Sequence, residues 1–281
     1  NENKIKLKYG LNPQQTNSYL TFDYYPNAFK LLNGVLGYIN VLDILNGWLT
    51  VMEAEDILKY PAAISMKHTS LAGLAIGNKI SNETMKYYEV NDPIHISDLS
   101  KAFMKSRTGD PLSSFGDFIC LSRKVDLDTA LLIKREVCDG IAAPDFSEEA
   151  LEILREKKGG KFIIVNMDLT YYNLIKSDGW NEKRSMYGVN LVQQNNSSQV
   201  KLDDFDTPMN IDLVLANIAL KYSQSNNISI CSDGQIIGMG CGQQNRVNCV
   251  KLAGDKSNDF NYYSKRGLLS MVYLATLIYW L

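Results

Sequence analysis

The sequence predicts a layered α-β-α fold of the α/β class. Between residues 126 and 167, the patterns of two helices and two strands follow one another at short intervals. Between residues 210 and 250, a helix pattern, a strand hairpin and the start of another helix repeat this style. The 281 residues, 45% of them hydrophobic and 21% charged, are enough for one large or two smaller globular domains. Strands that alternate with helices at this spacing are typical of a sheet covered by helices.

The first group opens with a helix. Asp126 is its predicted N-cap, and the helix should end near Arg135. Asp139 and Gly140 are predicted to form the turn that follows. Residues 141–143 are then expected to be a short buried strand, because they are apolar and are followed at once by a proline.

A second helix and a strand complete this group. Ser147 is the predicted N-cap of a helix over residues 148–157, whose apolar residues share one face. Gly159 and Gly160 should terminate this helix. Residues 161–167 contain an apolar run rich in β-branched side chains and are predicted to be a strand.

The second group is built around a hairpin. Asn210 is the predicted cap of a helix over residues 211–222. Residues 227–231 and 235–239 flank the sequence Ser-Asp-Gly, which is a hairpin turn signal. Another helix should begin near Asn245, and residues 177–179 and 193–206 are expected to be connecting loops.

Charge and cysteine content exclude some classes of protein. The net charge of −2 argues against a nucleic-acid-binding surface spread over the fold, although a local cationic pocket for a small anion is compatible with it. The five cysteines form no Cys-x-x-Cys pair, and their number is odd. With no recognisable signal peptide before them, we expect reduced thiols and a cytoplasmic protein.

Residues 267–281 are uncharged and strongly apolar, and they follow Lys265 and Arg266. They can be interpreted as an element that packs inside the domain, as a membrane anchor, or as a truncated or frame-shifted end. A membrane-spanning helix needs about 20 apolar residues, which makes a membrane location the less favoured interpretation.

Lys67 and His68 are neighbours, and the chain has only one other histidine, His95. An imidazole beside an ammonium group is a ready base and acid pair. The alternative is a surface lysine followed by a hydrogen-bonded histidine. His95 lies in no comparable context, and we expect a structural role for it.

Several segments are richer in glycine, polar and charged residues than folding requires. They are residues 8–15 (KYGLNPQQ), 65–71 (SMKHTSL), 107–118 (RTGDPLSSFGDF), 135–144 (REVCDGIAAP), 221–226 (KYSQSN), and 238–246 (GMGCGQQNR), which leads into 252–256 (LAGDK). In this order they resemble 5-aminoimidazole-4-carboxamide ribonucleotide (AICAR) transformylase, usually the C-terminal half of a bifunctional protein with inosine monophosphate (IMP) cyclohydrolase. The resemblance runs from about Leu7 to about Asp259, without the cyclohydrolase half, and the family's chain continues further.

The resemblance implies transfer of a formyl group from 10-formyltetrahydrofolate to the 5-amino group of AICAR, in IMP biosynthesis. It implies catalytic roles for Lys67, His68 and Asn226. His68 would act on the amine through the neighbouring carboxamide, and Lys67 would stabilise the oxyanion or protonate the leaving nitrogen. Asn226 would orient the carboxamide and the formyl oxygen. A residue at a helix C-terminus is the structural alternative for Asn226.

The resemblance also implies binding residues. They are Lys8, Tyr9, Phe115, Gly116 and Asp139 for the substrate, and Arg246 and Val247 for the folate. Lys8 stands where the family usually has arginine, so the charge is kept but the bidentate fork is lost. Gln14 stands where a histidine is common. Structural alternatives are a core role for the Phe115 ring and a turn role for Asp139.

For the fold, the resemblance implies two cytidine-deaminase-like subdomains, residues 1–175 and 176–281, the second incomplete. It implies a homodimer with active sites at the interface, and a potassium ion is expected from the family alone. The His-x-Glu and Pro-Cys-x-x-Cys signature of zinc deaminases is missing, so no zinc site is expected. The alternative is that the chain is a catalytically impaired, truncated relative, which binds nucleotide or acts as a dimer-forming scaffold. We expect this chain alone to have little activity.

Overall fold

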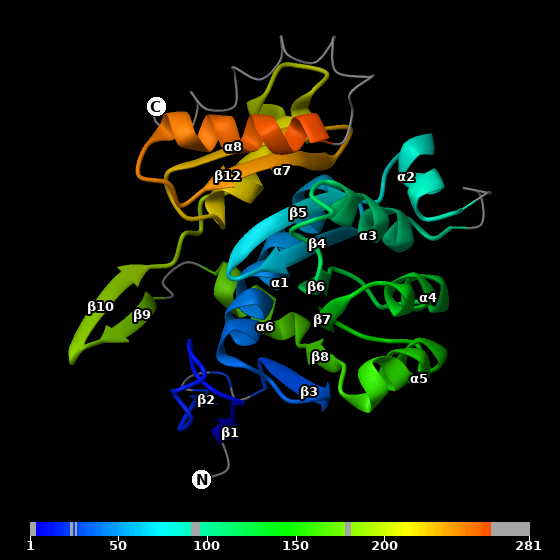
Figure 1. Cartoon of the computed structure of the whole chain (residues 1–281). Helices are drawn as coiled ribbons and strands as arrows, with labels where there is room; N and C mark the ends of the chain where they lie inside the picture. Colours follow the sequence, from blue (N-terminus) through cyan, green and yellow to red (C-terminus); the bar gives the residue numbers. More distant parts are fainter. Residues whose placement is uncertain (1–3, 23–24, 26, 91–95, 178–180, 260–281) are drawn as a thin grey trace.

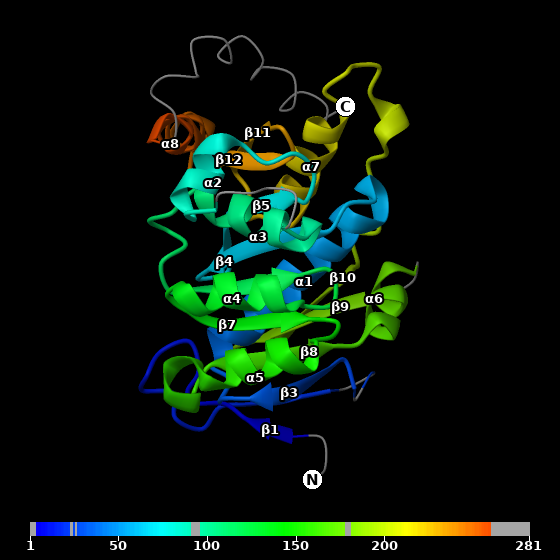
Figure 2. The ribbon, with the colours of Figure 1, turned by 90° about the vertical axis from the view of Figure 1, so that its right-hand side faces the viewer.

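The computed structural model describes residues 4–22, 25, 27–90, 96–177 and 181–259. Eight strands form one mixed sheet in the order β11-β12-β5-β4-β6-β7-β8-β3, which Figure 2 shows from top to bottom. The strands are β3 (Phe29–Asn33), β4 (Ala62–Lys67), β5 (Ser70–Ile76), β6 (Asp117–Leu121), β7 (Cys138–Ala143), β8 (Ile163–Met167), β11 (Asn227–Ser232) and β12 (Gln235–Cys241). The predicted α/β class is thereby confirmed.

Helices cover both faces of the sheet. In Figure 1, α1 and α6 lie on one side of strands β6 to β8, and α4 and α5 lie on the other. The helices are α1 (Tyr38–Leu58), α2 (Asn82–Tyr87), α3 (Asp98–Thr108), α4 (Leu127–Arg135), α5 (Glu148–Glu156), α6 (Leu169–Lys176), α7 (Asn210–Lys221) and α8 (Arg246–Asp259). Because both faces are covered, the central strands are apolar almost throughout rather than alternating with polar residues.

Two apolar cores result from this arrangement. Successive residues of a strand point to opposite faces, so Ile64 of β4 packs in the core that contains Trp48 of α1. Ala63, the residue before it, packs in the core that contains Phe103 of α3. Strands β6 and β7 pair in parallel, as do β7 and β8, whereas β4 is antiparallel to both β5 and β6.

Local cap chemistry places several elements where the sequence predicts them. Asp126 caps α4 by accepting the amide of Thr129, and Ser147 caps α5 by accepting the amide of Ala150. The hairpin of β11 and β12 turns at Asp233 and Gly234, both with positive φ. These three predictions are confirmed.

Two local predictions are wrong. Asp139 and Gly140 lie inside β7 rather than in a turn, because β7 pairs along β6 from Cys138 onward. Gly140 also has no room for a side chain, since a Cβ there would lie 2.5 Å from the Phe118 ring. Asn210 is the first residue of α7 rather than its cap, which is Met209.

The sheet continues across the predicted subdomain boundary. Strand β12 joins β5 through a single residue pair, Gln235 and Ala75. Helix α8 packs against β12, where Cβ atoms at Gly238 and Gly240 would lie 2.2 and 2.1 Å from carbonyl oxygens of the helix. The glycine-rich segment therefore allows close packing between a strand and a helix.

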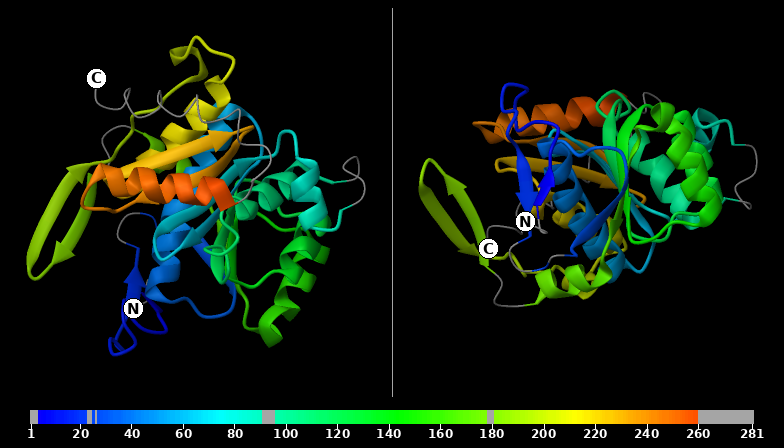
Figure 3. Two further views of the ribbon diagram at one scale, coloured as in Figure 1. Left: turned by 45° about the horizontal axis from the view of Figure 1, so that its top comes forward. Right: turned by 90° about the horizontal axis from the view of Figure 1, so that it is seen from below.

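The remaining elements are small. Strands β1 (Lys4–Lys6) and β2 (Tyr19–Thr21) pair with each other, as do β9 (Asn181–Met186) and β10 (Val189–Gln194), and two 3₁₀ turns cover Lys157–Gly160 and Leu202–Asp204. Both views of Figure 3 show the β9–β10 hairpin projecting from the body of the molecule.

Two features of the sequence lie outside the described residues, namely His95 and the apolar residues 267–281. Among the helices that are described, none combines the length and the apolar character needed to cross a bilayer. All five cysteines lie in the described part of the chain and are free thiols.

Candidate active site

The Lys67–His68 pair lies at a tight turn between β4 and β5. Lys67 ends β4, Ser70 begins β5, and the two residues between them have φ values of 50° at His68 and 66° at Thr69. Left-handed backbone is uncommon for non-glycine residues and particularly so for a β-branched residue such as threonine. The turn carries no glycine or asparagine that would have predicted it from the sequence.

Lys67 is held by a second loop. Its Nζ atom donates hydrogen bonds to the carbonyl oxygens of Phe115 at 2.8 Å and Gly116 at 2.7 Å. Gly116 has a φ of 72°, which glycine adopts without strain. A lysine ammonium has three donors, so one donor of Lys67 is left for a ligand.

A buried polar network fixes this loop. Asp117 is fully buried and accepts a hydrogen bond of 2.6 Å from Ser65 on β4. Its other oxygen pairs with the buried guanidinium of Arg107, which also contacts Glu136 at 3.1 Å. Burial raises the pKa of Asp117, and the Arg107 charge opposes this effect. The loop that holds Lys67 is thus anchored to both β4 and α3.

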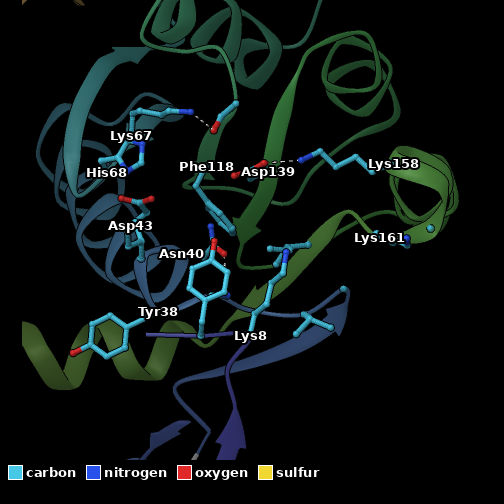
Figure 4. A pocket seen from close by; sticks show the side chains of 18 residues that line it. Lys8, Tyr38, Asn40, Asp43, Lys67, His68, Phe118, Asp139, Lys158 and Lys161 are labelled. Carbon is cyan, nitrogen blue, oxygen red and sulfur yellow. Dashed lines mark hydrogen bonds and ion pairs between the residues drawn. The ribbon is translucent and has the colours of Figure 1, made fainter. Parts of the chain in front are cut away.

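A cavity of about 760 Å³ lies beside the turn (Figure 4). Residues from the N-terminal segment, α1, β4, the Phe115 loop, β7 and the turn after α5 line it. Six of the predicted site residues are among them: Lys8, Tyr9, Lys67, His68, Gly116 and Asp139. The structure thereby brings together residues that are up to 131 positions apart in the sequence, since the set runs from residue 8 to residue 139.

The cavity is rich in positive charge. Lys8, Lys67, Lys158 and Lys161 line it. Lys158 pairs with Asp139 at 2.6 Å, and Lys67 donates to carbonyl groups, whereas no ion-pair partner is found for Lys8 or Lys161 among the described residues. An anionic group such as a phosphate suits this arrangement.

Asp43 of α1 also lines the cavity and was not predicted. Its side chain is 4% exposed and accepts the Thr69 amide at 2.7 Å. In Figure 4 it lies next to His68. Burial raises the pKa of Asp43 to about 7, while the Thr69 hydrogen bond and Lys67 act in the opposite direction. The only sequence signal was an acidic residue inside an otherwise apolar helix segment.

Four predicted residues do not line the cavity. The Phe115 side chain is 64% exposed, so it is not a core residue, and its carbonyl group is what contacts Lys67. Asn226 lies immediately before β11, not at the end of α7, and donates to the Gln243 carbonyl at 3.0 Å. Arg246 begins α8, and Val247 beside it is 63% exposed. The Lys67–His68 pair lines the cavity, and the predicted folate residues do not.

The described residues contain no group of three or more His, Cys, Asp or Glu side chains that could hold a metal ion. The ionisable side chains that line the cavity carry amines, an imidazole, phenols and carboxylates.

Comparison with known proteins identifies relatives. The model of the AICARFT/IMPCHase bienzyme family matches residues 1–256, and a COQ9 model matches residues 248–281. The bifunctional purine biosynthesis protein PurH of Clostridium botulinum is similar: 31% identical over 265 residues in strain Kyoto and 33% over 266 residues in strain 657. Each alignment covers 91% of this chain and 47% of the relative, so the chain spans about half the length of these relatives.

Proposed function

This chain belongs to the AICARFT/IMPCHase bienzyme family, and we propose that it transfers the formyl group of 10-formyltetrahydrofolate to the 5-amino group of AICAR. The product, formyl-AICAR, belongs to IMP biosynthesis, and the five free thiols support a cytoplasmic location. The observation that carries the proposal is the convergence of the Lys67–His68 pair with Lys8, Tyr9 and Asp139 around one cationic cavity.

The chemistry needs a base and an oxyanion donor. The 5-amino group of AICAR is a poor nucleophile because its lone pair is delocalised toward the carboxamide. His68 accepts the proton, through the carboxamide, as the nitrogen attacks the formyl carbon. The remaining N–H of Lys67 donates to the oxyanion of the tetrahedral intermediate or to the leaving folate nitrogen.

The lysines account for recognition of the substrate phosphate. Lys8 and Lys161 line the cavity without an ion-pair partner among the described residues, so their charge is available to an anion. Lys158 is already paired with Asp139, and this pair can orient Asp139 toward the ribose or the base.

We also propose a homodimer of two-subdomain chains, residues 1–175 and 176–281, with cytidine-deaminase-like folds. A second copy would bring Asn226, Arg246 and Val247 to the cavity that they do not line in one subunit. The projecting β9–β10 hairpin supports this proposal, because its apolar side chains, including Tyr187 at 99% exposure, need a covering surface. Light scattering should give a dimer mass, and Leu191→Lys should lower it while Glu149→Lys on α5 does not.

A formyl-transfer assay that follows tetrahydrofolate release tests the reaction, and calorimetry with AICAR and IMP tests binding. Turnover that depends on His68 would support the proposed formyltransferase activity. Binding without turnover favours the alternative, a nucleotide-binding or scaffold relative, for which the separation of Asn226 from the cavity is the relevant observation. No heat with either ligand at millimolar concentration would exclude the enzyme and the nucleotide-binding relative, and only the scaffold would then be left.

A further inference from the structure

The turn that carries His68 is hydrogen-bonded to a side chain of α1. The Thr69 amide donates a hydrogen bond of 2.7 Å to Oδ1 of Asp43. His68 and Thr69 have φ values of 50° and 66°, a conformation that an L-residue with a branched side chain adopts only under constraint. The turn residues are exposed, so the constraint has to come from a few contacts such as this one.

The buried carboxylate is costly by itself. Asp43 is 4% exposed, and burial of a charged group is unfavourable unless it is paired. The charged groups that act on it are Lys67 of β4, which favours the carboxylate, and Asp139 of β7 and Asp117 of β6, which oppose it. The Cys120 thiol of β6 points to the Asp43 carbonyl.

We propose that Asp43 is a positioning residue: by accepting the Thr69 amide, it fixes the left-handed turn that presents His68 and Lys67 to the cavity. It acts on catalysis through the turn and does not itself handle the transferred group. The activity tests of this role rest on the proposed formyl transfer, whereas the test of the turn itself does not.

Three variants test whether Asp43 acts as a hydrogen-bond acceptor, as a charge or by filling space. Asp43→Asn keeps an acceptor oxygen for the Thr69 amide, and Asp43→Leu removes it while filling the space. Thr69→Gly in the Asp43→Leu background makes left-handed backbone intrinsically accessible at one of the two turn residues. Glu53→Gln is the matched control, because Glu53 is a second buried carboxylate of α1 and does not line the cavity.

Hydrogen exchange of the Thr69 amide in the ligand-free full chain, labelled with ¹⁵N-threonine, tests the turn directly. We expect Asp43→Leu to accelerate this exchange by at least about tenfold, since the amide loses its acceptor. Asp43→Asn and Glu53→Gln should leave it slow. Unchanged Thr69 exchange in a folded Asp43→Leu protein would overturn the proposal, whatever the protein catalyses.

Turnover tests the consequence. Asp43→Leu should lower kcat about 10²-fold, with the melting temperature maintained, because misplacement of a reacting group is costly. Asp43→Asn should lower kcat less than about threefold, and Thr69→Gly should restore about tenfold of the Asp43→Leu loss. Equal losses in Asp43→Asn and Asp43→Leu, or no rescue by Thr69→Gly, would mean that the carboxylate acts directly, and the positioning role would be wrong. Absence of turnover in the wild type would refute the proposed function. The exchange experiment would then be the test of whether Asp43 fixes the turn.

Discussion

The Nζ atom of Lys67 lies 2.7 Å from the carbonyl oxygen of Gly116, a residue 49 positions further along the chain. This contact joins the end of β4 to the loop that precedes β6. Gly116 is the residue that permits it, because its backbone is left-handed, with a φ of 72°. An ideal Cβ at this position would lie 3.0 Å from Nζ, so a side chain there would displace the ammonium group.

Gly116→Ala should therefore lower turnover by disturbing Lys67. Its stability cost should be about 1 kcal/mol from the strained φ. Gly159→Ala is the control, because Gly159 has a φ of 60° and open space around its Cβ position. Urea unfolding and the formyl-transfer assay should show similar stability losses in both variants but lost activity only in Gly116→Ala. Equal activity in the two variants would contradict a role for this contact.

His68→Ala and Lys67→Ala should each remove most of the turnover, by about 10²–10⁴-fold, if each handles a proton or charge in the transition state. Steady-state kinetics with AICAR and 10-formyltetrahydrofolate measures the effect. His95→Ala provides the comparison, and the same loss at His95 and His68 would show that the assignment is wrong.

Lys8 and Lys161 should control affinity for the phosphate of the ligand. Lys161→Ala and Lys8→Ala are each expected to weaken IMP binding about tenfold, because a charge-assisted hydrogen bond contributes about 1.5–3 kcal/mol. Lys8→Arg should strengthen binding, since guanidinium can bind phosphate with two donors. Calorimetry at low and high salt checks this, and Lys6→Ala, outside the cavity, should have no effect.

The pH dependence of stability should reveal Asp43. Burial raises its pKa in the folded state to about 7, above the value of about 3.9 in an unfolded chain. Between these values the folded state binds more protons, so Asp43 lowers the free energy of unfolding as the pH rises from about 4 to about 7.

Asp43→Asn should consequently be more stable than the wild type at pH 8, by at most about 4 kcal/mol. The difference should shrink below pH 7 and disappear near pH 4. Urea unfolding of both proteins at several pH values measures it. A constant difference at all pH values would rule out titration of Asp43 as the cause.

Two glycines should respond in opposite directions near α8. Gly240→Ala should destabilise the protein by about 1–3 kcal/mol through overpacking, because its Cβ would lie 2.1 Å from the Cys249 carbonyl oxygen. Gly254 lies within α8 with open space around its Cβ position, and Gly254→Ala should stabilise the protein by about 1 kcal/mol. Thermal unfolding of both variants tests whether α8 packs closely against β12 or is only loosely attached to it.

Local chemistry explains which elements were predictable. The N-caps Asp126 and Ser147 each bond an amide three residues later, so their effect depends on a short stretch of sequence. Asp139 shows the limit of this approach. Aspartate followed by glycine is typical of a turn, but pairing along β6 placed both residues in a strand, because tertiary context outweighs weak local preference.

Composition and patterning predicted the α/β class and most element boundaries in the two groups, and the resemblance implied Lys67, His68, Asn226 and seven binding residues, whose roles stay predictions. The three-dimensional fold is what brings six of those residues to one cavity, together with Asp43, Lys158 and Lys161. It also decided the left-handed turn at His68 and Thr69. The physical reason is distance along the chain: the turn is held by a carboxylate 26 residues before Thr69, and Lys67 by carbonyl groups 48 and 49 residues after it. Contacts of this kind leave no periodic or cap signal in the neighbouring sequence.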